Sequence, residues 1–314
     1  MSLFAQHFTQ LGIYFFSGAL IFCFYGCGAE NASEDRENSL NEHSPVKSKK
    51  GRHVFDDGSV YDGELVAGKP EGYGERRYLN DDVYIGRFRE GLPHGQGTYR
   101  YKSDPKLTRY VGVWQNGKRN GYGSLYLADG SVFVGQWSAN VMVHGEFRGV
   151  DGTLLSGTWR GDSLERGKMS QGDGAIFTGI FDLEGRYLAG SLHAANGDHF
   201  VGSFLNGIYD GSGTLVKGDG TTYVGAFKAG LYSGEGILED PEGRRYIGSF
   251  LRGNPSGVGQ QAVSTGVVYS GDWKDGLRHG KGSIDFGDGT SYVGEFRNGL
   301  AYDGQYDWGD GRVT

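Results

Sequence analysis

The sequence predicts an all-β protein, an elongated single-layer antiparallel sheet of about eleven stacked β-hairpins. Glycine supplies 59 of the 314 residues and proline only 6, so neither a collagen nor a Pro/Gly-rich disordered chain fits. Aromatic residues make up 14% of the chain, which argues against disorder. Glycines and aromatic residues also recur together at a nearly constant spacing, and this indicates a stack of short repeats.

The chain begins with an uncharged, apolar segment. Residues 1–27 contain no Lys, Arg, Asp or Glu, and the run from Leu11 to Tyr25 is almost wholly apolar. A run of about fifteen residues fits the core of a signal peptide better than a membrane span, which needs about 20. Gly26 and Cys27 follow, and this start resembles a bacterial lipoprotein signal peptide, in which the cysteine becomes the lipid-modified N-terminus. The resemblance implies lipidation at Cys27 and a membrane-anchored, extracytoplasmic place in the cell envelope; the alternatives are an uncleaved membrane anchor, ordinary secretion and a wrongly assigned start codon.

A polar linker is expected next. Residues 28–50 lack aromatic residues and hold no periodic apolar face, so they should form a flexible tether to a repeat domain at residues 51–314. The two cysteines, Cys23 and Cys27, both precede this linker. The repeats are therefore expected to fold without disulfides or thiolate metal sites.

Eleven repeat units follow one another at a spacing of 22 to 26 residues. They open at Tyr61, Tyr84, Tyr110, Phe133, Leu155, Phe177, Phe200, Tyr223, Tyr246, Tyr269 and Tyr292. Each unit predicts a β-hairpin, and no segment carries the apolar spacing of a helix free of glycine. Because a lone hairpin is only marginally stable in water, the stability should come from stacking between neighbouring units.

The unit that opens at Tyr110 shows the pattern. Tyr110, Gly112 and Trp114 share one face of a strand because side chains alternate between the two faces. A tight turn is expected over Gln115–Arg119, with Gly117 supplying the flexibility it needs, and a second strand is expected at Tyr122–Leu127. With no side chain at the glycine, rings of neighbouring units can lean over the backbone and stack along the array.

These units resemble the MORN (membrane occupation and recognition nexus) repeat family, whose unit reads Y-x-G-x-[WF]-x-x-G-x-x-x-G-x-G. The resemblance covers residues 61–314, and the segment from Tyr269 to Gly282 is the best single copy. It implies a single-layer sheet that serves as an interaction scaffold, often near membranes. Units opening at Phe133, Leu155 and Phe177 lack part of the glycine set, so residues 133–199 are either a specialised face or repeat drift.

The aromatic rows are the candidate binding surface. A thin sheet cannot bury both faces, and contiguous exposed aromatic surface usually marks a contact site. The candidate residues are Tyr84, Tyr110, Trp114, Trp137, Tyr223, Tyr246, Tyr269, Trp273 and Tyr292. The competing ligands are a protein segment, a polysaccharide and lipid head groups. The alternative is that the rings pack on one another and leave little surface free.

Motifs for catalysis, cofactor binding or metal binding are not found. The Asp-Gly pairs are typical of hairpin turns rather than calcium loops, and His94 and His279 share one repeat position that is expected in a turn. The net charge is −7, of which the repeats carry about −6, so DNA or RNA is a poor partner. We therefore expect a non-enzymatic, membrane-tethered scaffold that binds an unidentified protein, and self-association through open sheet edges is a further hypothesis. The alternative function is a carbohydrate- or phospholipid-binding module that uses the aromatic face.

Overall fold

The structure, a computed structural model, describes residues 47–314. Over this range the chain forms 23 strands and no helix. The predictions for the apolar segment, for Cys27 and for most of the linker fall outside the described residues. The first strand begins at Lys49, two residues before the predicted start of the repeat domain at Gly51.

Two compact units divide the chain. Of the described residues, 47–128 and 136–140 form what we call the N-terminal unit, and 129–135 and 141–314 form the C-terminal unit. The N-terminal unit contains β1 (Lys49–Val54), β2 (Val60–Val66), β3 (Lys69–Arg77), β4 (Val83–Arg89), β5 (Leu92–Arg100), β6 (Leu107–Gln115) and β7 (Lys118–Leu127). Residues of β8 (Val132–Ser138) belong to both units.

The C-terminal unit holds the remaining strands. They are β9 (Val141–Arg148), β10 (Leu154–Arg160), β11 (Ser163–Ser170), β12 (Ile176–Phe181), β13 (Tyr187–His193), β14 (His199–Leu205), β15 (Ile208–Val216), β16 (Thr222–Lys228), β17 (Leu231–Glu239), β18 (Arg245–Leu251), β19 (Asn254–Ala262), β20 (Val268–Lys274), β21 (Leu277–Asp285), β22 (Ser291–Arg297) and β23 (Leu300–Asp307).

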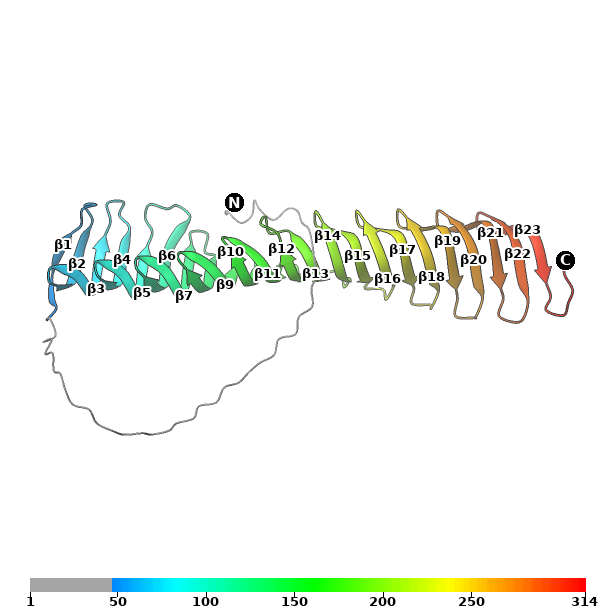
Figure 1. Cartoon of the computed structure of the whole chain (residues 1–314), viewed down its shortest axis with the longest axis horizontal. Coiled ribbons are helices and arrows are strands. Elements are labelled where there is room, and N and C mark those ends of the chain that lie inside the picture. The colour runs from blue at the N-terminus through cyan, green and yellow to red at the C-terminus, as the bar shows by residue number, and fades with distance from the viewer. Residues whose placement is uncertain (1–46) are drawn as a thin grey trace, which may run out of the picture. The chain divides into compact units, whose positions relative to one another are not determined.

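In each unit, consecutive strands pair antiparallel, β1 to β7 in the N-terminal unit and β9 to β23 in the C-terminal unit, as Figure 1 shows. All 23 strands belong to one antiparallel sheet. The predicted fold class, an all-β array of consecutive hairpins, is confirmed.

The hairpin turns are tighter than the sequence predicted. In the unit of Tyr110, Gln115 pairs with Lys118, so only Asn116 and Gly117 lie between the strands. Both residues have positive φ, 50° and 76°, as in a two-residue type I′ turn that matches the twist of the flanking strands. The glycine is needed here because other residues are strained at such φ values. The predicted turn over Gln115–Arg119 is therefore too long at both ends.

Paired glycines form the floor on which the aromatic rings lie. Gly112 stands directly opposite Gly123 on the next strand, and the ring of Tyr110 covers both. A Cβ atom at Gly123 would lie 2.1 Å from the Tyr110 hydroxyl oxygen, so no larger residue fits beneath this ring. The Tyr110 hydroxyl donates a hydrogen bond to the Val113 carbonyl at 3.3 Å. The tyrosines that open six other units likewise donate to the carbonyl three residues further along the chain. The expected close approach of ring and backbone is thus present.

A wide bulge distinguishes the regular units. Between the pairs Gly112–Gly123 and Trp114–Arg119, the three residues 120–122 lie opposite Val113 alone. Gly121, at the centre of this bulge, has a φ of 86°. The units opening at Leu155 and Phe177 have a smaller shift of one extra residue, and neither has a glycine at the bulge.

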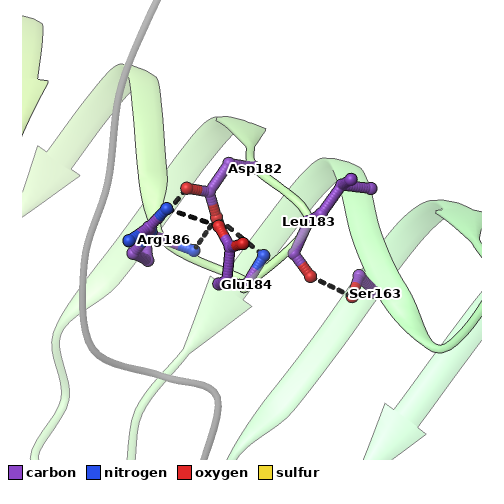
Figure 2. Close-up of polar contacts among 5 residues, drawn as sticks. All are labelled: Ser163, Asp182, Leu183, Glu184 and Arg186. Carbon is purple, nitrogen blue, oxygen red and sulfur yellow. Dashed lines mark hydrogen bonds and ion pairs between the residues drawn. The ribbon is translucent and has the colours of Figure 1, made fainter.

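The unit of Phe177 also closes its hairpin with a different turn, over residues 182–186 (Figure 2). The Asp182 carboxylate accepts hydrogen bonds from the backbone N–H groups of Glu184 and Arg186, at 2.9 and 3.0 Å, and pairs with the Arg186 guanidinium. The same D-x-E-G-R chemistry recurs at residues 240–244, where it joins successive repeat units. The sequence departures within residues 133–199 thus change turns and bulges while the strands keep pairing.

Candidate interaction surface

The predicted aromatic face is the core of the protein. Eight of its nine residues are at most 6% exposed, which contradicts their expected exposure. They are Tyr84, Tyr110, Trp114, Trp137, Tyr223, Tyr246, Tyr269 and Trp273. Tyr292, in β22, is intermediate. The prediction of an exposed aromatic row is therefore wrong for these eight residues, and the alternative that the rings pack on one another describes them correctly.

Ring-to-ring packing buries the aromatic side chains. In the N-terminal unit the Tyr110 ring meets Trp114 and Trp137 edge to face, with centroids 5.2 and 5.5 Å apart. The Trp137 Nε1–H donates to the Gly123 carbonyl at 3.1 Å, so its polar group stays satisfied when buried. Because the paired glycines let each ring lie close to the backbone, neighbouring rings can pack on one another along the sheet.

In several units the tenth residue covers the first ring from the other side, whereas in the unit of Phe177 the eleventh residue, Tyr187, stacks on the ring with centroids 4.1 Å apart. In the C-terminal unit the Tyr232 ring stacks on Tyr223 with centroids 3.8 Å apart, and the Arg278 guanidinium lies 4.9 Å from the centre of the Tyr269 ring. Burial raises the pKa of both Tyr223 and Tyr269 to about 12 and lowers the pKa of Arg278. The rings therefore offer little free surface for a sugar or a lipid head group to stack on.

The opposite face of the sheet carries the exposed apolar surface. We call this side the outer face; it holds the residue that precedes each unit, the second and fourth residues of the unit, and the cross-strand partners of all three. In the C-terminal unit, one cross-strand row on this face consists entirely of β-branched residues: Val201, Thr214, Val224, Ile237 and Ile247. We name it the aliphatic ladder. Val224 is 49% exposed and Ile247 is 39% exposed, so the ladder faces solvent.

Further exposed aliphatic side chains stand near the hairpin turns of the same strands. Leu205 and Ile208 are directly paired across the first of these turns, and Leu231 and Leu251 occupy the same margin in the next two hairpins. Exposed apolar surface that gathers on one face marks interaction sites. The sequence carries a signal for this apolar face, since Val or Ile recurs at the second position of many units. The aromatic pattern of the other face is more conspicuous.

A pair of histidines lies on the outer face next to the ladder. His193 of β13 and His199 of β14 are direct cross-strand partners, and their rings stack with centroids 4.0 Å apart. The His199 Nε2 lies 2.8 Å from the Ser191 hydroxyl oxygen. Partial burial, and secondly the neighbouring His193, lower the pKa of His199. The sequence alone does not indicate this pair, because the two residues come close only through the strand register.

Within residues 47–314 there is no cluster of three or more His, Cys, Asp or Glu side chains that could hold a metal ion. Over the same range, no helix has the length and apolar character needed to cross a membrane.

The hairpin stack, its glycine floor and its exposed outer face define a repeat scaffold. The family model of the MORN repeat matches nine segments that together cover more than half of the chain: residues 61–83, 84–104, 110–132, 133–154, 200–222, 223–243, 246–261, 269–291 and 292–301. The chain therefore belongs to the MORN repeat family, whose arrays serve as scaffolds for protein or membrane interaction. Residues 155–199, which hold the units of Leu155 and Phe177, are not among the matched segments.

Several solved structures are similar to parts of this chain at low identity. One is the TCP domain of SAS-4 (dCPAP) in complex with a proline-rich motif of Ana2 (dSTIL) of Drosophila melanogaster, at 14% identity over 70% of this chain and 98% of that chain, with a TM-score of 0.15. Another is a catalytically inactive virginiamycin B lyase from Staphylococcus aureus with quinupristin, at 10% identity over 79% of this chain and 94% of that chain, with a TM-score of 0.14. A third is a streptogramin B lyase, at 12% identity over 85% and 84% of the two chains, with a TM-score of 0.13. No curated protein sequence matches the chain.

Proposed function

We propose that this chain is a non-enzymatic, membrane-tethered scaffold that binds a partner protein on the outer face of its C-terminal unit. The observation that carries the proposal is the aliphatic ladder of Val201, Thr214, Val224, Ile237 and Ile247. These side chains come from five successive strands and do not contribute to the aromatic core on the other face.

The energetics favour a partner that covers this row. Fully burying a Val or Ile side chain contributes about 1.5–3 kcal/mol, and Val224 and Ile247 still hold a large part of that area exposed. Exposed leucines near the hairpin turns, such as Leu231 and Leu251, add apolar area on the same strands. A sheet face of fixed spacing also loses little conformational entropy on binding, since backbone hydrogen bonds already hold the strands.

The tether is proposed from the sequence alone. The apolar segment of residues 1–27 would hold the chain at the membrane, with Cys27 as the lipidated residue, and the polar stretch that follows would set the reach of the scaffold from the membrane. The compartment that follows from this proposal is the cell envelope. Mass spectrometry of the mature N-terminus tests it: a lipid on Cys27 supports the tether, and an unmodified N-terminus elsewhere in the chain contradicts lipidation.

Site-specific photo-crosslinking tests the binding face. A photoreactive phenylalanine is placed at Val224 or Ile247 in the full chain, and, as a control, at the exposed Leu79 in the N-terminal unit. We expect the same protein to be cross-linked from positions 224 and 247 and not from position 79. Equal products from all three positions, or products abolished by Val224→Glu only together with unfolding, would contradict a specific face.

A carbohydrate or phospholipid bound on the aromatic face is not supported, because the rings that were to hold it are buried. Glycan or short-chain lipid that protects Trp114 and Trp273 from fluorescence quenching would reverse this conclusion.

A further inference from the structure

Charge is distributed very unevenly along the repeats. Residues 47–128 contain fifteen Lys and Arg against ten Asp and Glu, a net charge of +5, whereas residues 129–314 contain fifteen against twenty-three, a net charge of −8. The overall acidity of the chain therefore conceals a basic N-terminal unit. Such asymmetry between parts of one chain points to a partner of opposite charge.

The excess of positive charge is concentrated on four consecutive strands. β4 to β7 contain no Asp or Glu at all and carry six basic residues. Three of these, Arg87, Arg100 and Arg109, are exposed on the outer face, because they alternate with the buried aromatic residues and glycines of their strands. Within the described residues, none of these three forms an ion pair with a carboxylate, although Arg109 lies over the Tyr126 ring at 4.2 Å.

The pairing of Arg100 with Arg109 is the sharpest observation. These residues are direct cross-strand partners in β5 and β6. Like charges in this arrangement destabilise a sheet. At the same repeat position in the C-terminal unit, Arg245 of β18 stands opposite Glu239 of β17, and the two form an ion pair at 3.7 Å. The fold therefore accommodates a pair of opposite charges at this position. The N-terminal unit has two positively charged guanidinium groups there instead.

Exposed aromatic and aliphatic side chains lie between these arginines. Tyr73 is the direct partner of Arg87, Val111 follows Arg109 by two residues on the same face, and Tyr122 is 57% exposed on β7. Arginine and tyrosine together are the residues most enriched at the centres of protein interfaces, whereas a purely electrostatic surface for lipid needs only charge. The guanidinium geometry also suits carboxylates, which it binds through two parallel hydrogen bonds.

We propose that the outer face of β4–β7 is a docking site for an acidic segment of a partner protein, with the Arg100–Arg109 pair binding its carboxylates. Carboxylates placed between the two guanidinium groups would convert their repulsion into two attractive contacts. This site uses residues of the N-terminal unit only, so it does not depend on the aliphatic ladder or on the function proposed for it.

The test measures binding of a fluorescein-labelled peptide of alternating Glu and Leu to the full chain in a neutral detergent. Arg100→Glu would recreate the charge pair found at Glu239 and Arg245, so we expect it to weaken binding about tenfold without lowering the melting temperature. Arg109→Gln should weaken binding as well. The matched control Arg245→Gln, at the equivalent repeat position, should bind the peptide as the unaltered chain does.

Three outcomes would overturn the proposal. One is peptide binding that Arg100→Glu leaves unchanged. Another is binding that does not depend on charge, shown either by equal binding of the Gln and Leu counterpart of the peptide or by binding that persists when salt is raised from about 0.1 M to about 1 M and the Debye length falls from about 10 Å to about 3 Å. The third is displacement of the peptide by short-chain phosphatidylglycerol at lower concentration than by unlabelled peptide, which would assign the face to lipid head groups.

Discussion

Replacing Gly123 by alanine tests whether the glycine floor is what holds the aromatic core together. The φ angle of Gly123 is not positive, so alanine is allowed by the backbone. The added methyl group, however, would lie 2.1 Å from the hydroxyl oxygen of Tyr110 and 2.4 Å from its ring. The ring must therefore lift off the sheet, and any loss of stability reports on the ring rather than on backbone strain.

The expected loss follows from what the ring would give up. Overpacking in a filled core costs about 1–3 kcal/mol. The hydrogen bond to the Val113 carbonyl contributes about 0.5–1.5 kcal/mol more. We expect a total of about 2–4 kcal/mol, which corresponds to a decrease of about 30- to 1,000-fold in the amide protection of β6 and β7. Hydrogen exchange measured by mass spectrometry is the suitable assay, because stacked repeats need not unfold in one step.

Two controls make the result decisive. Gly68→Ala, at a turn with φ of 79° and no atom within 4 Å, should cost only the about 1–2 kcal/mol of backbone strain. In a Tyr110→Leu background, where the ring is gone, Gly123→Ala should cost clearly less than in the unaltered chain. If Gly123→Ala costs the same in both backgrounds, the proposed role of the glycine floor is refuted.

Two further predictions concern the C-terminal unit. Ser163→Ala removes the hydroxyl that donates to the Leu183 carbonyl at 2.6 Å (Figure 2). It should destabilise β11 and β12 by about 0.5–1.5 kcal/mol, measured by hydrogen exchange. An unchanged protection pattern would show that the contact is energetically neutral. The lowered pKa of His199 means that the folded state favours the neutral ring, so its stabilisation is present above pH 6.5 and is lost as the pH falls toward and through the lowered value. Melting temperatures measured across this range should decline less steeply in His199→Gln, and an identical slope in both proteins would rule out this contribution.

Much of the fold follows from the sequence, because the same local pattern of aromatic residues and glycines recurs along eleven units. Tyr110, Gly112 and Trp114 could be placed on one face by alternation alone, and the glycine at the turn is needed for its positive φ. The predicted ends of the strands were less accurate, since the length of the turn depends on which two residues remain unpaired. The wide bulge at Gly121 was not predicted, because a glycine within a strand does not show how many residues will lie opposite a single residue of the neighbouring strand.

The candidate site was harder to predict, and the reason is physical. Exposed aromatic residues usually mark a contact surface, but the glycines that make the rings conspicuous also let them lie flat and bury one another. The sequence shows the rings and the glycines, while burial also depends on a residue from the other strand of the hairpin, such as Tyr232 over Tyr223. Likewise, Arg100 and Arg109 are nine positions apart, and only the register across the intervening loop makes them direct neighbours.

The requirement for a filled aromatic core leaves one face of the sheet for specific recognition. The first, third and fifth residues of each unit must supply ring, glycine and ring, so their identity says little about the partner. The residue that precedes each unit, its second and fourth residues and their cross-strand partners are not constrained in this way, and they differ between the units: Val224 and Ile247 give an apolar face, whereas Arg87, Arg100 and Arg109 give a basic one. Substitutions that exchange side chains between equivalent outer positions should therefore change what the scaffold binds while leaving its stability nearly unaltered, because these positions do not touch the core.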